Sequence, residues 1–277
     1  MSSAILTNIN TYPIKSIKGV SLNRALVKDT GLELDRNFVI TDLNGKFITG
    51  RTKSSLVLVE SKITSAGLIL NAPGMPELAI FYANFSKTYQ NVQVWNDQIS
   101  AQHCDDKIDH WFSMYLNFSC KVYYLGEHSH RSVLGYEHKL SFADGYPLLL
   151  ISEASLNALN NRLKQPVTMA QFRPNLVVSQ CLDFAEDGWH KIRIGDVNFE
   201  IVKPCSRCIF TTVNEVNGQR NKQKEPLSTL KKFRQAQDKE IYFGQNLIAL
   251  NEGSIKIGDK VEIISKQTAP QYSNLKL

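Results

Sequence analysis

Short runs of β-branched, aromatic and aliphatic residues, separated by turn-forming residues, fill the first hundred positions of this chain. The run over residues 5–11 alternates along its length, and two β-rich runs between Leu32 and Arg51 meet at Asn44 and Gly45. Asn and Gly both tolerate the positive φ of a hairpin turn. Further short runs occupy residues 55–63, 68–70, 78–81 and 92–95. Strands this short and closely spaced predict a small barrel or sandwich.

Helical periodicity begins near residue 100. Asp105 or Asp106 can cap a helix whose apolar residues share one face and which ends near Asn117. A buried strand over residues 147–151 is predicted to run into a second helix, capped by Ser152 and ending near Pro166, with Leu156, Leu159 and Leu163 as its apolar stripe. A third, short helix is expected to have Pro226 in its first turn.

Two segments of the second half resemble each other, KIRIGDVNFEIV at residues 191–202 and SIKIGDKVEII at residues 254–264. Each places Ile-Gly-Asp between alternating arms, which predicts a tight hairpin with Gly first in its loop. Paired hairpins of this kind suit a second barrel. The chain is therefore predicted to be mainly β with α (α+β). An N-terminal β-barrel domain is expected over residues 1–100, a second β-barrel domain with packing helices over residues 101–265, and a flexible tail over residues 266–277.

Composition limits the classes of function. The 277 residues suffice for two ordinary domains, and a hydrophobic content of 43% with 21% charged residues is typical of globular proteins. No apolar run approaches the ~18 residues of a membrane span, so a soluble chain without a membrane role is expected. The net charge of +6 is spread along the chain. It gives no reason to predict a nucleic-acid partner, and it fits a site for an anionic small molecule equally well.

The predicted chemical centre is KPCSRCIFTT, residues 203–212. It places Cys205 and Cys208 three residues apart, with Arg207 between them and Lys203 just upstream. Nearby positive charge favours the thiolate, which is the form that attacks electrophiles or binds soft metals.

Three other uses of these thiols are less consistent with the sequence. A four-thiolate zinc site needs a second cysteine pair, but Cys104, Cys120 and Cys181 are scattered singly. A thioredoxin-like dithiol needs its motif at the start of a helix, whereas a β-like run follows here. A disulfide is disfavoured by the odd number of cysteines, five, and by an N-terminus without an apolar signal core. Reduced, intracellular thiols are predicted.

Seven motifs are spread along the chain: YPIKS (12–16), LDRNF (34–38), SFADGYP (141–147), FRPN (172–175), KPCSRC (203–208), EPLSTLKKFR (225–234) and IGDKVEI (257–263). Taken together, they resemble the MOSC-domain molybdenum-cofactor proteins. The resemblance is to the two-part kind, in which a MOSC N-terminal β-barrel precedes the MOSC domain, as in the bacterial YcbX-type proteins and the mitochondrial amidoxime-reducing component. It extends from about residue 5 to residue 265.

The resemblance implies a set of site residues. Cys208 is implied to be the protein ligand to molybdenum, with the remaining equatorial sulfurs supplied by the pterin dithiolene, and Cys205 to be a neighbour without a metal bond. A pterin phosphate would be gripped by basic side chains. Asp144 and Cys181 also occupy motif positions, and Asp144, in the turn before a strand, is the candidate for a proton route. The implied cofactor-binding residues are Lys15, Ser16, Arg36, Arg173, Asn175, Cys205, Ser206 and Arg207.

The implied activity is reduction of N-hydroxylated compounds, such as hydroxylaminopurines, hydroxylamines or amidoximes, by oxygen-atom transfer to molybdenum. YcbX-type proteins commonly carry a C-terminal ferredoxin domain with cysteines spaced CxxxxCxxC. Because no cysteine follows Cys208, a separate donor of ferredoxin, flavodoxin or cytochrome type is expected. The lack of an N-terminal targeting segment predicts a cytoplasmic protein. Two alternatives are a cofactor carrier or sulfur-transfer protein without turnover, and a thiol redox protein built on Cys205 and Cys208.

Overall fold

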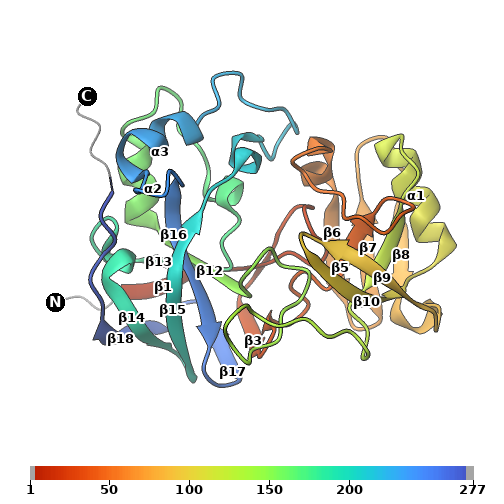
Figure 1. The fold of residues 1–277 in the computed structure, drawn as a ribbon, viewed down its shortest axis with the longest axis horizontal. Helices are drawn as coiled ribbons and strands as arrows, with labels where there is room; N and C mark the ends of the chain where they lie inside the picture. The colour runs from red at the N-terminus through yellow and green to blue at the C-terminus, as the bar shows by residue number, and fades with distance from the viewer. Residues whose placement is uncertain (1–3, 273–277) are drawn as a thin grey trace.

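The computed structural model describes residues 4–272, which form two units side by side (Figure 1). The unit on the right of Figure 1 contains β5 to β10 and helix α1, and the unit on the left contains β1 and β12 to β18 with helices α2 and α3. The chain is mostly β, as predicted.

The left-hand unit is a closed barrel. Pairing of β1 with β13 joins the two ends of a row of seven strands, so that none of the seven is left as an edge. Strands β12 and β13 are parallel, and the other neighbouring strands of the ring are antiparallel. The ring runs β13 (Leu176–Ser179), β12 (Leu148–Ser152), β16 (Tyr242–Ala249), β15 (Val197–Ser206), β14 (Trp189–Ile194), β18 (Lys260–Lys266) and β1 (Ala4–Thr11), and β2 (Val20–Leu22) pairs with β1 outside the ring.

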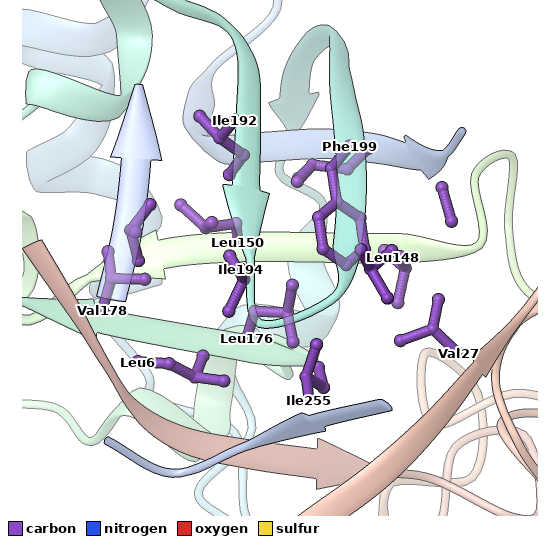
Figure 2. Close-up of a cluster of buried hydrophobic side chains, with 14 of the residues drawn as sticks. Leu6, Val27, Leu148, Leu150, Leu176, Val178, Ile192, Ile194, Phe199 and Ile255 are labelled. Carbon is purple, nitrogen blue, oxygen red and sulfur yellow. The ribbon is translucent and has the colours of Figure 1, made fainter. Parts of the chain in front are cut away.

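Strand β12 shows why the barrel forms. Its sequence LLLIS is buried on both faces, because alternate side chains enter different cores. Leu148 and Leu150 point into the barrel interior (Figure 2), whereas Leu149 and Ile151 pack outward with residues of the helices. A separate three-stranded sheet contributes buried side chains from all of its strands to the same interior: β3 (Arg24–Lys28), β4 (Gly31–Leu32) and β17 (Gly253–Lys256).

The right-hand unit has a four-stranded and a three-stranded sheet. The first contains β5 (Phe38–Thr41), β11 (Lys121–Tyr124), β10 (Asp97–His103) and β9 (Tyr89–Val94), and the second β6 (Glu60–Thr64), β7 (Gly67–Asn71) and β8 (Leu78–Phe81). Phe38 and Ile40 pack in one core with α1 and the smaller sheet, and Val39 enters a second core beneath β9 and β10.

The helices begin where capping residues were predicted. Asp105 accepts a hydrogen bond from the backbone of Lys107 at the start of α1 (Asp106–Leu116), and the left-handed Asn117 follows its end. Ser152 caps α2 (Glu153–Asn160) by accepting from Ser155 N. Both caps are confirmed, but α2 ends six residues before Pro166. Pro226 immediately precedes α3 (Leu227–Arg234).

Two turn predictions have different outcomes. Residues Gly195 and Asp196 form the predicted two-residue loop, since Ile194 pairs with Val197 and Gly195 has a φ of +54°. The prediction of a hairpin at the second Ile-Gly-Asp segment is wrong. Its arms β17 and β18 pair with different partners, β3 in one case and β14 and β1 in the other, because the chain crosses here between two sheets.

Two further predictions fail in detail. Residues 55–63 were expected to be β-like, but their first part lies in a 3-10 helix, η1 (Ser54–Leu58), before β6 begins. At Asn44 and Gly45 only Gly45 has positive φ, and the carboxylate of Asp42 closes the turn by accepting from Asn44 N and Lys46 N. Beyond this turn Phe47 makes a single bridge to Thr41, so the second arm is not a strand.

Two strands cross the predicted domain limits. Residue 100 lies inside β10, and α1 and β11 pack with the right-hand unit, whereas β1 belongs to the barrel. Within the predicted tail, β18 includes Lys266, and the Tyr272 ring lies 3.9 Å from the Arg234 guanidinium. Residues 273–277 of that tail lie outside the described part of the chain.

Candidate functional site

A cleft of about 280 Å³ collects the predicted site residues from widely separated parts of the chain. It is lined by the loop after β1, the loops near residues 36 and 50, the segment before β12, the 3-10 helix η3 (Met169–Phe172), and the segment from the end of β15 to η5 (Ile209–Thr212). The predicted residues that line it are Lys15, Ser16, Arg36, Asp144, Arg173, Asn175, Cys205, Ser206, Arg207 and Cys208. Cys181 is elsewhere: it packs on the barrel core, where burial raises the pKa of its thiol to about 11.

The two thiols of the motif have different surroundings. Strand β15 has an irregular register between Pro204 and Ser206, which turns successive side chains at the barrel rim in new directions. Cys205 is half-buried, and Arg207 Nη1 donates to its sulfur at 3.0 Å. Cys208 is exposed and lines the cleft, while its carbonyl accepts from Thr211 N and Oγ1 at 3.1 and 2.9 Å. Cys208 is therefore the thiol available to a ligand.

The Tyr12 ring contacts two arginines of the cleft. The guanidinium carbons of Arg36 and Arg173 lie 4.4 and 4.1 Å from the Tyr12 ring centroid. Arg36 also pairs with Asp35 and donates to Asn175 Oδ1 at 3.0 Å, and Arg173 donates to Ile17 O at 2.6 Å. Burial raises the pKa of Tyr12 to about 12, so the phenol stays neutral. Burial lowers the pKa of Arg173 to about 10, which leaves it charged at neutral pH.

Backbone conformation is unusual along the cleft wall. Ser16, Arg36 and Arg173 have φ values of +75°, +51° and +58°, a region that L-residues other than Asn and Asp seldom adopt. Such residues cluster at functional sites, where the surrounding contacts hold them in place.

Lys15 and Asp144 form an ion pair at the other side of the cleft. Lys15 Nζ lies 2.6 Å from Asp144 Oδ1 and 2.7 Å from Phe142 O, and Trp95 Nε1 donates to the same Asp144 oxygen at 3.0 Å. Burial lowers the pKa of Lys15 to about 8, although the Asp144 carboxylate opposes this. The surrounding protein disfavours the charged form of Asp144, but Lys15 outweighs this effect and holds the pKa of that carboxyl well below its usual range.

Both parts of the chain match known protein families. Residues 3–119 match the MOSC N-terminal beta barrel domain, and residues 137–262 match the MOSC domain. Mitochondrial amidoxime-reducing component 1 of Danio rerio is 32% identical over 273 residues, which cover 93% of this chain and 84% of that protein. The human protein of the same name is 32% identical over 275 residues (92% and 81%), and mitochondrial amidoxime reducing component 2 of Rattus norvegicus is 35% identical over 276 residues (90% and 80%). The chain belongs to the MOSC-domain family.

Solved structures are more distant. YiiM from Geobacillus stearothermophilus aligns with 43% of this chain and 55% of its own at 15% identity and a TM-score of 0.32. A solution structure of a protein from Bordetella bronchiseptica aligns with 42% of this chain and 86% of its own at 14% identity and a TM-score of 0.31. These scores are too low to support a comparison of the cleft.

Within residues 4–272, no helix combines the length and apolarity needed to cross a membrane.

The MOSC family is associated with binding of the molybdenum cofactor, and the cleft residues fit that group. Six cations line the cleft (Lys15, Arg36, Arg51, Arg173, Lys203 and Arg207), against one carboxylate, Asp144. In the described chain Lys15 and Arg36 form ion pairs and the other four do not. The buried Arg207 Nε has no hydrogen-bond partner among the described residues. A phosphate would satisfy such donors, and the exposed Cys208 thiol is a ligand type that soft metals prefer.

Some residues in or beside the cleft were not predicted as site residues. Arg51 was noted only as flanking a hairpin, but its guanidinium carbon lies 4.1 Å from the Trp95 ring. Tyr12 and Trp95 contact cleft arginines without lining the cavity; Tyr12 lies in the YPIKS motif, whereas Trp95 carried no signal beyond β propensity. Lys203 was noted for its charge, and it lies 5.6 Å from the Tyr146 ring at the rim.

Gly50 lies against the ring of Phe210, two residues after Cys208, and this close contact leads to a prediction. A Cβ on Gly50 would lie 2.1 Å from a ring carbon of Phe210, two residues after Cys208. We expect Gly50→Ala to displace this ring and to lower the free energy of unfolding by about 1–3 kcal/mol, the usual cost of overpacking. Urea unfolding measures this. Gly188→Ala is the control, because its nearest neighbour would be Gln267 O at 3.8 Å. Equal stability of the two variants would contradict the contact.

Proposed function

We propose that this chain reduces N-hydroxylated compounds at a molybdenum cofactor held in the cleft, with electrons from a separate protein. The observation that carries the proposal is the exposed Cys208 thiol in a cleft lined by six cations. Membership of the MOSC-domain family and the names of the amidoxime-reducing relatives support it.

The residues divide into two groups by chemistry. Cys208 would bind the metal through its thiolate, and Arg36, Arg173 and Arg207, with Asn175 and Ser206, would hold the pterin and its phosphate. Arg207 also keeps Cys205 occupied, which leaves Cys208 as the metal ligand. When bound, the cofactor supplies the two-electron removal of oxygen from the N–O bond. The protein supplies orientation of the cofactor and delivery of protons.

Proton delivery is the task that Lys15 and Asp144 are placed to perform. Conversion of an N-hydroxylated compound and two electrons into the amine and water consumes two protons. A lysine with a pKa of about 8 is mostly protonated at neutral pH, yet gives up its proton more readily than an ordinary lysine. The Asp144 side chain is 64% exposed, so it connects the buried Lys15 ammonium to bulk water.

The proposed substrates are hydroxylaminopurines, hydroxylamines and amidoximes, and the proposed donor is a ferredoxin, a flavodoxin or a cytochrome. The exposed cations Lys203, Arg220 and Lys222 would favour a donor with an acidic surface. The cytoplasmic location stays a prediction, since the relatives are named as mitochondrial.

The direct test is metal analysis with pterin fluorescence on protein from a host that makes the cofactor, followed by assay of hydroxylaminopurine reduction with an artificial electron donor. Near-stoichiometric molybdenum together with turnover is the expected result. Molybdenum and pterin without turnover under any donor would favour the alternative, a cofactor carrier or sulfur-transfer protein. Protein without either, from a host shown to load other molybdenum proteins, would contradict both.

The Lys15 and Asp144 pair leads to a pH prediction. If protonated Lys15 is the acid, kcat/KM should fall as pH rises through about 8, where Lys15 loses its proton. The charge of Asp144 raises the pKa of Lys15, so Asp144→Asn should move this fall to lower pH. The profile is measured from pH 5.5 to 9.5, with Glu60→Gln in an exposed ion pair as control. A fall at the same pH in both variants would exclude Lys15 as the acid.

A further inference from the structure

The segment between β11 and β12 carries a buried arginine that lies outside the cleft. Arg131 is 9% exposed and does not line the cavity. Its Nε donates to Asp97 Oδ2 at 2.8 Å. Its other donors bind backbone carbonyls: Nη1 binds the oxygens of Ser141, at 2.8 Å, and Ala143, and Nη2 binds that of Asp144 at 3.1 Å. One guanidinium thus holds three carbonyls of a four-residue loop.

The loop is also held from the side of the cleft. Lys15 Nζ binds Phe142 O, the carbonyl between two that Arg131 binds, and pairs with the Asp144 carboxylate. Residues 141–144 therefore bind Arg131, which lies outside the cleft, and Lys15, which lines it. Because these contacts fix the backbone of Asp144, they fix where its carboxylate can lie.

Arg131 also connects this loop to the turn between β9 and β10. Its anion, Asp97, is the first residue of β10, two residues after Trp95. Trp95 has a φ of +57° and donates its indole N–H to Asp144 at 3.0 Å. The Trp95 indole and the Asp144 carboxylate thus belong to two segments that Arg131 ties together.

We propose that Arg131 is a positioning residue for the reduction, which sets the places of the Asp144 carboxylate and the Trp95 indole. This inference rests on the proposed function of the cleft. A rigid, planar fork with five N–H donors can bind several acceptors at once, which a lysine ammonium on a flexible stem cannot reproduce. Asp97, its one carboxylate partner, has a side chain that is 50% exposed, so the three carbonyls supply much of the compensation for burying the charge.

A double-mutant cycle tests whether Arg131 acts through Asp144. Misplacement of a reacting group by ~1 Å can cost about 100-fold in rate. We expect Arg131→Met to lower kcat per bound molybdenum between about tenfold and about 100-fold, and Arg131→Lys to lower it less. In an Asp144→Asn background the same substitution should cost less than about twofold, because residues that act together are not additive. Equal losses in both backgrounds, or no loss in either, would overturn the proposal.

The matched control is Arg234→Met. Arg234 is 3% exposed and ion-paired with Asp187, so its loss also removes a buried guanidinium. Its effect on kcat per molybdenum should be the same with and without Asp144→Asn. If Arg131→Met does not fold, Arg131→Lys takes its place in the cycle, since an ammonium keeps the charge but cannot bind Asp97 and three carbonyls at once.

A second measurement needs neither cofactor nor turnover. Trp95 is 44% exposed, whereas Trp111 and Trp189 are 4% and 3% exposed, so acrylamide quenching of tryptophan fluorescence reports mainly on Trp95. Arg131→Met or Asp97→Asn should increase the quenching constant in the cofactor-free protein, and Arg234→Met should not. No increase would overturn the proposal even if the wild type is active. An increase in a protein without turnover would support the positioning and contradict only the proposed function.

Discussion

Replacing Cys208 with alanine should abolish reduction of N-hydroxylated compounds, whereas replacing Cys205 should lower it without abolishing it. Cys208 is exposed in the cleft, and its loss removes the only soft ligand that faces the cavity without a bond to a guanidinium in the described chain. Cys205 touches Arg207 instead, so Cys205→Ala leaves Arg207 Nη1 without its sulfur acceptor. We expect a loss of about tenfold for that variant, at the low end of the range for outer-shell residues of metal sites.

The test measures both the turnover and the cofactor content of each protein. Molybdenum per chain, pterin fluorescence and kcat are determined for both variants and the wild type. Pterin should partly persist in Cys208→Ala, because the arginine and lysine contacts remain. Turnover by molybdenum-loaded Cys208→Ala would show that another group binds the metal. Equal damage from the two substitutions, in protein without molybdenum, would instead favour a redox dithiol.

The features predictable from sequence are those decided within a few residues. The caps at Asp105 and Ser152 are local hydrogen bonds, and the Gly195 loop needs only a residue that accepts positive φ. The second Ile-Gly-Asp segment has the same local chemistry as the first. Its arms separate because β17 pairs with β3, more than 200 residues earlier in the chain, and no local pattern predicts that pairing.

The site shows the same division. Cys208 and the basic residues were found because they lie in recognisable motifs, but the reasons for their placement are distant contacts. Asn175 Oδ1 accepts from Arg36 Nη1 across 139 positions, and Lys15 pairs with Asp144 across 129. Trp95 and Arg131 were missed for this reason, because their functional contacts are formed only by the fold and neither belongs to a motif.

The cleft depends on the meeting of the two units. Arg36 and Lys15 belong to loops that follow barrel strand β1 and precede β5 of the other unit, whereas Arg173 and Cys208 come from the barrel unit. Neither unit alone carries the full set of cations. The stability of this junction and the capacity to hold an anionic cofactor are therefore coupled, and Arg36 is the residue at which the coupling can be measured.

Arg36→Met should cause the largest loss of stability among single substitutions in the cleft. Asp35, its ion-pair partner, has a side chain with no exposed surface, and the Arg36 side chain is 14% exposed. Removing one partner of a buried pair leaves a charge without compensation and costs about 3–5 kcal/mol. Lys18→Met is the control, since Lys18 and Glu60 are 46% and 60% exposed and such pairs contribute about 0–1 kcal/mol. Urea unfolding of the cofactor-free protein measures both.

A double variant separates stability from cofactor binding. Asp35→Asn together with Arg36→Met removes both charges, so it should recover part of the lost free energy of unfolding, because no buried charge is left alone. The Asp35→Asn substitution keeps a side-chain oxygen as the acceptor for Tyr12 N, which binds Asp35 Oδ1 at 2.9 Å in the wild type. Molybdenum content should nevertheless stay low, because the guanidinium that faces the cleft is absent from both variants. Recovery of molybdenum together with stability would mean that Arg36 holds the fold and not the cofactor.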